Sequence, residues 1–208
     1  MTNKQNIAII GAGGFGQEVF NLLDEDLYDC VGFIDYEKKE NLPVPIIGIE
    51  ADMIKLVKKY KFPNCVLAIG DMKIRKKIQN KIDEFSIKYP KIIDSSVRCF
   101  SKDIGDGVII YPGVIIMNDC KIGKYTLLNS GVTLGHNVII GDFCNINPGA
   151  HLAGRITIGD NVFIGIGANV IENIRIGNNV VIGAGSVVLN NVPDNTTVYG
   201  VPAKDAHS

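Results

Sequence analysis

Residues 152–182 read LAGRIT IGDNVF IGIGAN VIENIR IGNNVV I, a stretch in which one pattern returns every six residues. An aliphatic residue leads each hexad, and a small or β-branched residue stands four places later. The pattern extends from Ile104 to Pro193 over fifteen hexads. A helix would show an apolar period of about 3.6 residues and a half-buried strand a period of 2. A strict period of six is typical of a parallel β-helix.

The hexad predicts the geometry of this β-helix. Each hexad supplies one short strand and one corner, with the leading aliphatic residue and the small residue pointing inward. Three hexads close a triangular coil, so fifteen hexads make about five coils. Coils stacked at the usual strand spacing give a prism roughly 24 Å long. Cys120 and Cys144 occupy the small inward position of their hexads and are expected to be core residues.

A glycine-rich segment near the N-terminus indicates a second kind of structure. Gly11-Ala12-Gly13-Gly14-Phe15-Gly16 follows an apolar strand at residues 6–10 and opens a helix expected at residues 17–24. A second strand at residues 30–34 ends at Asp35. This is the setting of a phosphate-binding loop, in which a helix N-terminus faces a phosphate and an acid accepts hydrogen bonds from ribose hydroxyls. A tight turn whose glycines only permit close packing is the alternative.

The N-terminal part is too short for a complete dinucleotide-binding fold. A third strand is expected at residues 65–69 and a helix at residues 73–84, which makes little more than one βαβαβ half. We therefore predict a half-Rossmann domain at residues 1–95 that binds a mononucleotide or a nucleotide-sugar, followed by the β-helix at residues 96–208. Gly70 should face the same crevice as the glycine-rich loop, and Arg75 is a further candidate ligand contact.

Charge and composition limit the classes of partner that can be expected for this protein. The 208 residues carry a formal net charge of −1, which disfavours a nucleic-acid partner. No apolar run is long enough for a transmembrane helix, and the N-terminus lacks a secretory pattern, so no membrane association is expected. The five cysteines are scattered and show no metal-binding spacing, which is typical of a cytoplasmic protein.

Three histidines are the candidates for chemistry. His136 and His151 fall on outward positions of the hexads, and His207 lies in a polar tail. A histidine is suited to general-base work at neutral pH, and the flat walls of a prism suit packing of three chains with clefts between them. Two outward histidines that cannot stack on one wall do not make a catalytic zinc site, so no metal is expected. A solvated surface histidine is the alternative for each.

Taken with their order, these motifs resemble the bacterial sugar acyltransferases of the left-handed β-helix superfamily. The resemblance is to the group of sialic acid O-acetyltransferases and N-acetyltransferases of nucleotide-linked 4-amino sugars. It covers essentially the whole chain and rests on the glycine-rich loop, Gly32-Phe33-Ile34-Asp35, Ala68-Ile69-Gly70 with Ile74-Arg75, residues 129–136, Gly141-Asp142-Phe143, Leu152-Ala153-Gly154 and the ending Gly200-Val201-Pro202-Ala203-Lys204.

The resemblance implies a function and a set of site residues. It implies a homotrimer with active sites between subunits, in which acetyl-coenzyme A acetylates a nucleotide-linked amino sugar, such as a 4-amino-4,6-dideoxy sugar, for surface glycan biosynthesis. His136 would be the general base of a direct transfer without an acyl-enzyme. The implied sugar-nucleotide contacts are Gly13, Gly14, Phe15, Asp35, Tyr36 and Gly70. The implied acetyl-coenzyme A contacts are Asn145, Gly154, Ile166, Ala184 and Lys204.

The chain departs from the family pattern at three positions. Phe15 and Asn145 replace residues that are often histidine in the family, and Asn137 replaces the acid that often follows the base. Asp142 or Asp119 is a candidate replacement for that acid. Two alternatives remain beside the leading function: a sialic acid O-acetyltransferase, and a non-catalytic β-helix scaffold that binds a nucleotide-sugar.

Overall fold

The structure is a computed structural model that describes residues 4–37 and 39–206. It divides the chain into two compact units, Met1–Ile92 and Ile93–Ser208. Each unit has its own core and is described separately below. His207 lies outside the described residues.

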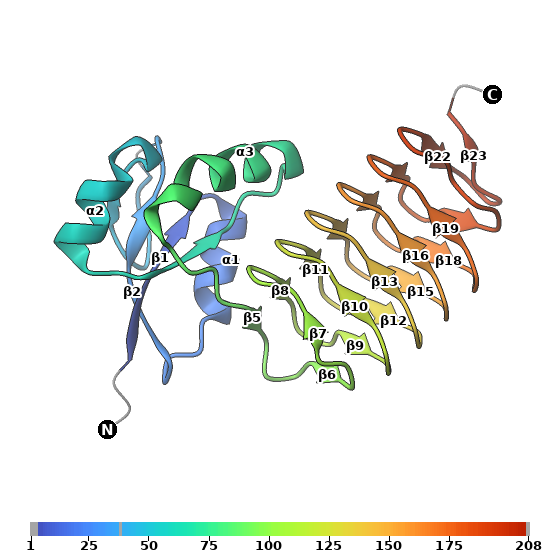
Figure 1. Cartoon of the computed structure of the whole chain (residues 1–208), viewed down its shortest axis with the longest axis horizontal. Helices are drawn as coiled ribbons and strands as arrows, with labels where there is room; N and C mark the ends of the chain where they lie inside the picture. Colours follow the sequence, from blue (N-terminus) through green and yellow to red (C-terminus); the bar gives the residue numbers. More distant parts are fainter. Residues whose placement is uncertain (1–3, 38, 207–208) are drawn as a thin grey trace. The chain divides into compact units, whose positions relative to one another are not determined.

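The N-terminal unit is a four-stranded parallel sheet with three helices (Figure 1). The sheet order is β3-β2-β1-β4, with every neighbouring pair parallel. In chain order the elements are β1 (Gln5–Ile10), α1 (Gly14–Leu22), β2 (Tyr28–Ile34), β3 (Ile46–Gly48), the 3₁₀ turn Glu50–Asp52, α2 (Met53–Tyr60), β4 (Asn64–Leu67), α3 (Met72–Ile82) and the 3₁₀ turn Asp83–Phe85. The predicted half-Rossmann arrangement is confirmed.

The sequence prediction missed two elements of this unit. These elements are β3 and α2. The central strand β1 is easier to recognise as a continuous apolar run, because Ile7, Ile9 and their neighbours are buried on both faces of the sheet. Edge strand β3 is only three residues long, and α2 buries only Met53 and Leu56 on one side. Their apolar signals are therefore short and were not distinguished from the preceding loop.

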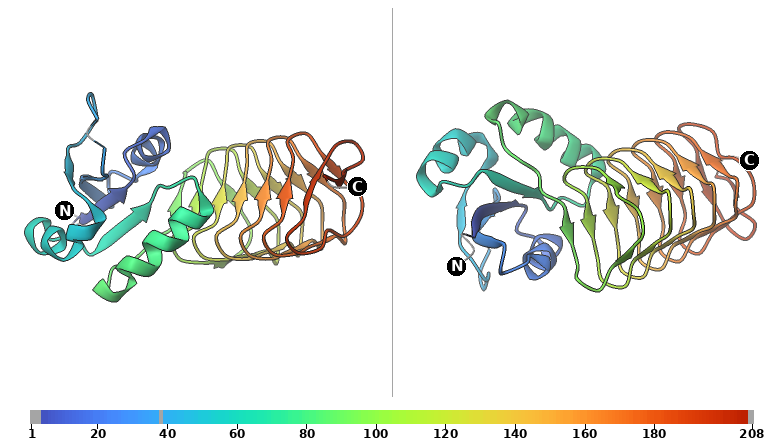
Figure 2. Two further views of the ribbon diagram at one scale, coloured as in Figure 1. Left: turned by 90° about the horizontal axis from the view of Figure 1, so that it is seen from above. Right: turned by 60° about the horizontal axis from the view of Figure 1, so that its bottom comes forward.

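The C-terminal unit is a left-handed parallel β-helix, as predicted, with short strands on three walls (Figure 2). Wall A contains β5 (Ile92–Ile93), β8 (Ile109–Ile110), β11 (Leu127–Leu128), β14 (Asn145–Ile146), β17 (Phe163–Ile164), β20 (Val181–Ile182), β22 (Thr197–Tyr199) and β23 (Lys204–Asp205). Wall B contains β6 (Arg98–Cys99), β9 (Ile115–Ile116), β12 (Thr133–Leu134), β15 (His151–Leu152), β18 (Asn169–Val170) and β21 (Val187–Val188). Wall C contains β7 (Asp103–Ile104), β10 (Lys121–Ile122), β13 (Ile139–Ile140), β16 (Thr157–Ile158) and β19 (Arg175–Ile176).

The predicted inward positions form a single core. Leading aliphatic residues such as Leu134 and Ile164 are buried, as are the small residues that follow four places later, such as Val138 and Ala168. Cys120 and Cys144 are buried in the same core. Each coil contacts only its neighbours, so the stack shares one continuous apolar interior.

The turn between strands explains the fourth position of the hexad. This position has a positive φ in every hexad from Gly107 to Gly185. Glycine and asparagine are frequent there because they tolerate left-handed backbone at the least cost. The set comprises Gly107, Gly113, Asp119, Tyr125, Gly131, Asn137, Phe143, Gly149, Arg155, Asn161, Gly167, Asn173, Asn179 and Gly185.

The hexad register ends earlier than the sequence suggested. Ile176 pairs with Val192 and Ile182 with Val198, so the last coil is two residues shorter than those before it. Val192 therefore takes a leading position and not the fifth position predicted for it. In this shortened coil the side chain of Asn191 accepts a hydrogen bond from the Arg175 N–H, at 2.7 Å. At the other end, β5 and β6 extend the coils before Ile104.

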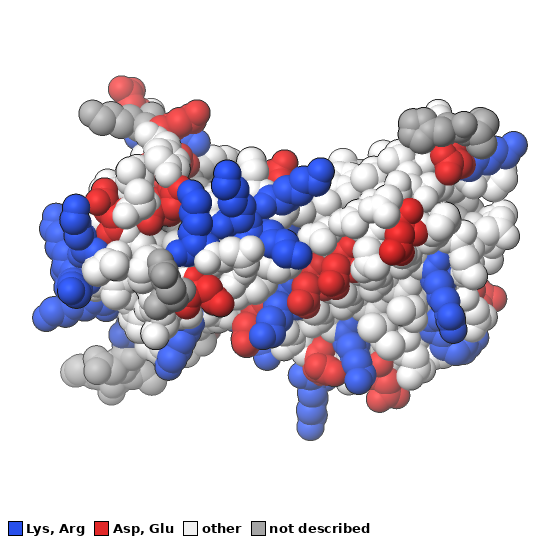
Figure 3. All heavy atoms as spheres, turned by 45° about the horizontal axis from the view of Figure 1, so that its top comes forward, with Lys and Arg blue, Asp and Glu red and all other residues white. Residues whose placement is uncertain are grey.

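Charged side chains gather unevenly on the N-terminal unit. Figure 3 shows Lys and Arg clustered on one face of it. Helix α3 contributes exposed lysines to this unit, namely Lys73, Lys76, Lys77 and Lys81. Within the described ranges, no helix combines the length and apolar character needed to cross a bilayer.

Candidate active site

The three corners of the β-helix differ in chemistry. The corner after wall A carries glycine at its positive-φ position in Gly113, Gly131, Gly149, Gly167 and Gly185. The corner after wall C is closed by side-chain to backbone hydrogen bonds. The corner after wall B, here called corner BC, presents Asp119, Asn137, Arg155 and Asn173 in one column, with His136 beside Asn137. Corner BC is therefore the candidate site on this unit.

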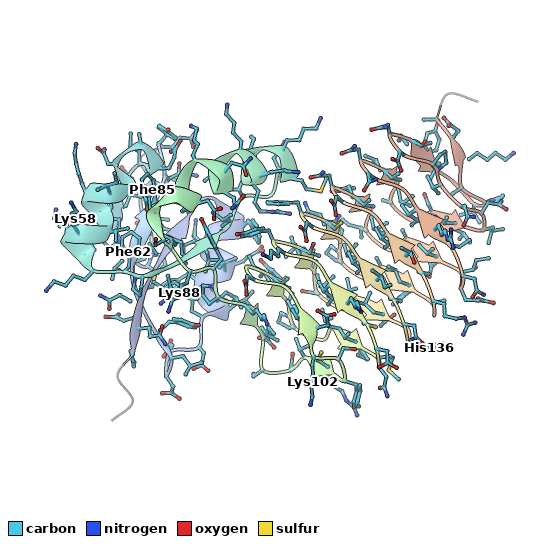
Figure 4. The ribbon with its side chains drawn as sticks, viewed as in Figure 1. Lys58, Phe62, Phe85, Lys88, Lys102 and His136 are labelled. Atoms are coloured by element: carbon cyan, nitrogen blue, oxygen red, sulfur yellow. The ribbon has the colours of Figure 1, made fainter. Side chains whose placement is uncertain are left out.

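His136 lies in the turn that follows β12, at the edge of the prism (Figure 4). Its side chain is exposed, as the hexad predicted. The Nδ1 atom lies 2.8 Å from Oδ1 of Asn137, and Nε2 lies 3.4 Å from Nη1 of Arg155. The two ring nitrogens thus have different partners, so the ring is held in one orientation.

Gly154 lies one coil further along the prism, against the same ring. A Cβ atom built on Gly154 would stand 2.7 Å from Nε2 and 3.0 Å from Cε1 of His136. The first distance is shorter than real Cβ contacts and the second is at their short limit, so a side chain at position 154 would force the His136 ring to shift. Gly154, predicted as a coenzyme contact, therefore also determines where the His136 ring can lie.

Arg155 and Asn173 complete the corner and were missed by the sequence prediction. The Arg155 Nε donates to Oδ1 of Asn173 at 2.7 Å. Asn137, Arg155 and Asn173 stand at intervals of one coil. Counting on from Asn137 in two steps of eighteen residues would have found both, because one coil is three hexads long.

Asp142 does not orient His136. It lies at the corner after wall C, where its Oδ1 accepts a hydrogen bond from the Lys124 N–H at 2.7 Å. Asp160, Asn178 and Asp194 each bond the backbone N–H one coil back in the same way. The carboxylate is therefore part of a ladder that holds the coils together, and Asn137 is the residue on Nδ1.

The glycine-rich loop of the N-terminal unit has two kinds of glycine. A Cβ on Gly11 would meet the Ala68 carbonyl oxygen at 2.5 Å, and one on Gly16 would meet the Gly11 oxygen at 1.9 Å. These two positions serve close packing of the loop, β4 and α1. Gly14 has nothing within 4 Å of its Cβ position, and Gly13 has only the Lys39 Nζ, at 3.7 Å. Gly13 and Gly14 therefore leave room that packing does not use.

The predicted sugar-nucleotide contacts lie at one edge of the sheet. Gly13, Asp35 and Gly70 follow β1, β2 and β4, which are adjacent and parallel, so their carboxyl ends share an edge. Phe15 lies in the first turn of α1. Tyr36 is 64% exposed, and its hydroxyl donates to the Glu50 carboxylate, which raises the pKa of Tyr36. Ligands of open parallel sheets bind at this edge.

Arg75 does not face this edge as a ligand contact. Its side chain is buried, at 2% exposure, and its Nη1 donates to the Ile69 carbonyl oxygen at 2.8 Å. The guanidinium therefore holds the end of β4 against α3, and the suggestion that it touches ligand is replaced by this structural role.

The Asp35 carboxylate is hydrogen-bonded to the backbone of the glycine-rich loop. Its Oδ2 accepts a hydrogen bond from the Ala12 N–H at 2.7 Å, and its Oδ1 accepts one from the Glu37 N–H at 3.0 Å. Lys39 Nζ lies 3.7 Å from Oδ2. Burial alone would raise the pKa of Asp35, but these hydrogen bonds and the ammonium group together lower it below its ordinary value. The carboxylate thus favours one loop conformation.

We expect Asp35→Asn to destabilise the N-terminal unit by about 1 kcal/mol at neutral pH. Because the folded-state pKa of Asp35 is lowered, its carboxylate stabilises the unit above the ordinary Asp pKa of about 3.9. That contribution is lost as the pH falls through the folded-state pKa, so wild type and variant should converge in acid. Urea unfolding followed by helical circular dichroism measures this, since α1, α2 and α3 all belong to this unit.

Glu37→Gln is the matched control, because its side chain is 78% exposed and its carboxylate pairs with the same ammonium group, that of Lys39. A pH-independent difference between wild type and Asp35→Asn would contradict the role given to the Asp35 charge.

The predicted coenzyme contacts do not form one cluster within a single chain. Gly154 lies at corner BC, whereas Ile166 and Ala184 lie one coil apart at the corner after wall A. Asn145 is on wall A and 5% exposed, and Lys204 is exposed on β23. Ile166 is 61% exposed although it is aliphatic. Wall B therefore separates the two corners that carry these residues.

The remaining histidine on the prism is placed apart from His136. His151 lies on wall B, where its Nδ1 is 2.8 Å from the hydroxyl oxygen of Thr133 on the neighbouring strand. Among the residues that the structure describes, no group of three His, Cys, Asp or Glu side chains could hold a metal ion.

Comparison with known proteins places both units in known families. The PglD N-terminal domain family matches residues 6–82. The bacterial transferase hexapeptide family (six repeats) matches residues 102–136, 119–154 and 155–190. The chain belongs to the bacterial acyltransferases of the left-handed β-helix superfamily. No curated protein matches the chain in sequence.

Three solved structures, two of them of acetyltransferases, are similar to this chain over nearly their whole length. A histidine variant of perosamine N-acetyltransferase from Caulobacter crescentus, in complex with CoA and GDP-perosamine, is 29% identical over 96% of each chain, with a TM-score of 0.90. The acetyltransferase domain of PglB from Neisseria gonorrhoeae, in complex with acetyl coenzyme A, is 28% identical over 97% of this chain and 99% of that one, with a TM-score of 0.87. WeeI from Acinetobacter baumannii is 26% identical over 97% and 100%, with a TM-score of 0.81.

Proposed function

We propose that the protein transfers the acetyl group of acetyl-coenzyme A to the amine of a nucleotide-linked amino sugar, with His136 as general base. The observation that carries the proposal is the exposed, oriented imidazole of His136, lying against Gly154, on a chain similar to the GDP-perosamine-bound acetyltransferase over 96% of its length. That neighbour has also been solved as a second variant, with the same histidine replaced by alanine.

The reaction is a direct transfer. The sugar amine attacks the thioester carbonyl carbon as Nε2 of His136 takes the proton that the nitrogen must lose. The carbon–sulfur bond then breaks, and the departing sulfur receives the proton from the imidazolium. A positioned base contributes about 10²–10⁴-fold to such a reaction. An exposed ring is suited to this exchange, because the acceptor and the thioester must both approach Nε2.

The N-terminal unit supplies the binding of the nucleotide-linked sugar in this proposal. Gly13, Gly14 and Gly70 provide backbone close to open space, and α1 begins at Gly14, where a helix N-terminus favours a phosphate. Phe15 and Tyr36 complete the set of contacts. Asp35 acts through the loop, since its oxygens already bond the N–H groups of Ala12 and Glu37.

A homotrimer is part of the proposal. Gly154 and the pair Ile166 and Ala184 lie at different corners, so a coenzyme that contacts both would lie between two prisms packed side by side. Asn145 and Lys204 are proposed as further contacts to the same coenzyme. We place the reaction in the cytoplasm, in line with the scattered cysteines of the sequence.

The proposal is tested by comparing acceptors at fixed acetyl-coenzyme A concentration. Thiol release should be fastest with a nucleotide-linked 4-amino-6-deoxy sugar and at background with sialic acid. The uridine, thymidine and guanosine forms of the sugar are compared in parallel. Faster turnover of sialic acid would replace the proposal with O-acetylation. Calorimetry that detects no acetyl-coenzyme A binding would replace it with a non-catalytic scaffold.

A further inference from the structure

The partner of His136 at Nε2 is a group that can only donate hydrogen bonds. A guanidinium has five N–H groups and no acceptor, so Arg155 can satisfy Nε2 only when that nitrogen carries its lone pair. A neutral imidazole has one N–H, which must then be on Nδ1 and donate to Oδ1 of Asn137. This is the tautomer that a general base acting through Nε2 requires.

Asn137 cannot select this tautomer by itself. Its side-chain amide offers an acceptor oxygen and a donor nitrogen, and a half-turn about its last bond exchanges them. With the nitrogen toward the ring, Nδ1 would become the acceptor and the proton would move to Nε2. A carboxylate at this position would accept only and would leave no such choice. The tautomer of His136 therefore depends on the residue at Nε2.

Hydrogen bonds hold the Arg155 side chain in a position from which it can select the tautomer of His136. Its Nε donates to Asn173, and its backbone N–H donates to the His136 carbonyl oxygen at 2.8 Å. The Asn173 N–H in turn donates to the Gly154 carbonyl oxygen at 3.1 Å. Arg155 and Asn173 thus keep the coil spacing, and the guanidinium reaches Nε2 of the ring that packs against Gly154.

We infer that Arg155 is a positioning residue that fixes the catalytic tautomer of His136, replacing the function of a carboxylate at position 137. The 3.4 Å contact is at the long limit of a hydrogen bond, so an arriving amine can displace the guanidinium from Nε2. The effect of Arg155 on turnover rests on the proposed function, whereas its effect on the tautomer does not.

The test measures the tautomer directly, with no substrate present. Long-range ¹H–¹⁵N correlation spectra of the full chain, recorded well above the ordinary histidine pKa of about 6.5, distinguish Nδ1–H from Nε2–H. The His136 signals are assigned by their loss in His136→Gln. We compare wild type, Arg155→Gln and Arg155→Lys. Lysine also only donates, whereas glutamine can donate or accept. All three side chains are unbranched at Cβ, so the positive φ of position 155 affects them alike.

We expect wild type and Arg155→Lys to hold the Nδ1–H tautomer and Arg155→Gln to lose it. In Arg155→Gln, kcat should fall roughly tenfold, with KM for both substrates unchanged, because only the fraction of competent base has changed. Adding Asn137→Asp to Arg155→Gln should restore both the tautomer and kcat. Asp is accommodated at this φ, as Asp119 adopts it one coil earlier. Arg175→Gln, on wall C, is the control for loss of an exposed arginine.

An unchanged Nδ1–H tautomer in Arg155→Gln would overturn the inference, whatever the enzyme acetylates. So would failure of Asn137→Asp to restore the tautomer in the double variant. Absence of turnover with every amino sugar would instead overturn the proposed function and leave the tautomer result to be judged separately.

Discussion

His136→Ala should fold as the wild type does and lose about 10²–10⁴-fold in kcat. The side chain is exposed and contributes nothing to the core, so its removal should leave thermal unfolding unchanged. The attacking amine would lose the base that we propose accepts its proton. Coenzyme A release, followed with a thiol reagent at saturating acceptor, measures the loss.

His151→Gln is the matched control for this substitution. His151 is also exposed and also accepts or donates a single side-chain hydrogen bond, to Thr133, but it lies on the face of wall B away from the corner. Its replacement should leave kcat within about twofold. Equal rates for wild type and His136→Ala would remove the base from the mechanism.

Gly154→Ala should reduce kcat by about 10²-fold while leaving stability nearly unchanged. The new Cβ would stand 2.7 Å from Nε2 of His136, so the exposed ring must rotate away. Such a rotation costs little in folding, because the ring edge is free to move into solvent. It costs much in catalysis, since a misplacement of about 1 Å can cost 10²-fold. Steady-state kinetics and thermal unfolding of the same preparation measure both effects.

Gly149→Ala is expected to behave in the opposite way. Gly149 has a φ of +65 and nothing within 4 Å of its Cβ position, so alanine meets no neighbour but must adopt left-handed backbone. That strain should destabilise the fold by roughly 1–2 kcal/mol, with kcat retained. If Gly154→Ala loses stability and activity together, the argument that it acts through the His136 ring is wrong.

The coil geometry could be predicted because it depends on a repeated local pattern. Any residue of the hexad array can be assigned to a wall or corner by its position, which placed His136 outward and Cys144 in the core. The same arithmetic, repeated in steps of eighteen residues from Asn137, leads to Arg155 and then to Asn173. It failed near Val192, where the coil is two residues shorter and the Asn191 side chain accepts the hydrogen bond of the Arg175 N–H.

The N-terminal site was predicted less fully, because its geometry depends on which of several possible partners each side chain bonds. The motif predicted where Gly13 and Asp35 lie, but not that the Asp35 oxygens bond the loop itself. It did not separate the packing glycines Gly11 and Gly16 from Gly13 and Gly14, since the folded positions of the Ala68 and Gly11 carbonyl groups decide which Cβ would clash. Arg75 likewise reads as a surface charge, although its side chain is buried and bonds the Ile69 carbonyl oxygen.

The most direct test of the account is the mass of the product formed from acetyl-coenzyme A and a nucleotide-linked 4-amino-6-deoxy sugar. The account predicts that the sugar gains one acetyl group on its amine, at a rate that falls in His136→Ala and is kept in His151→Gln. An unmodified amino sugar with wild-type enzyme, or an acetyl group placed on a hydroxyl, would contradict it.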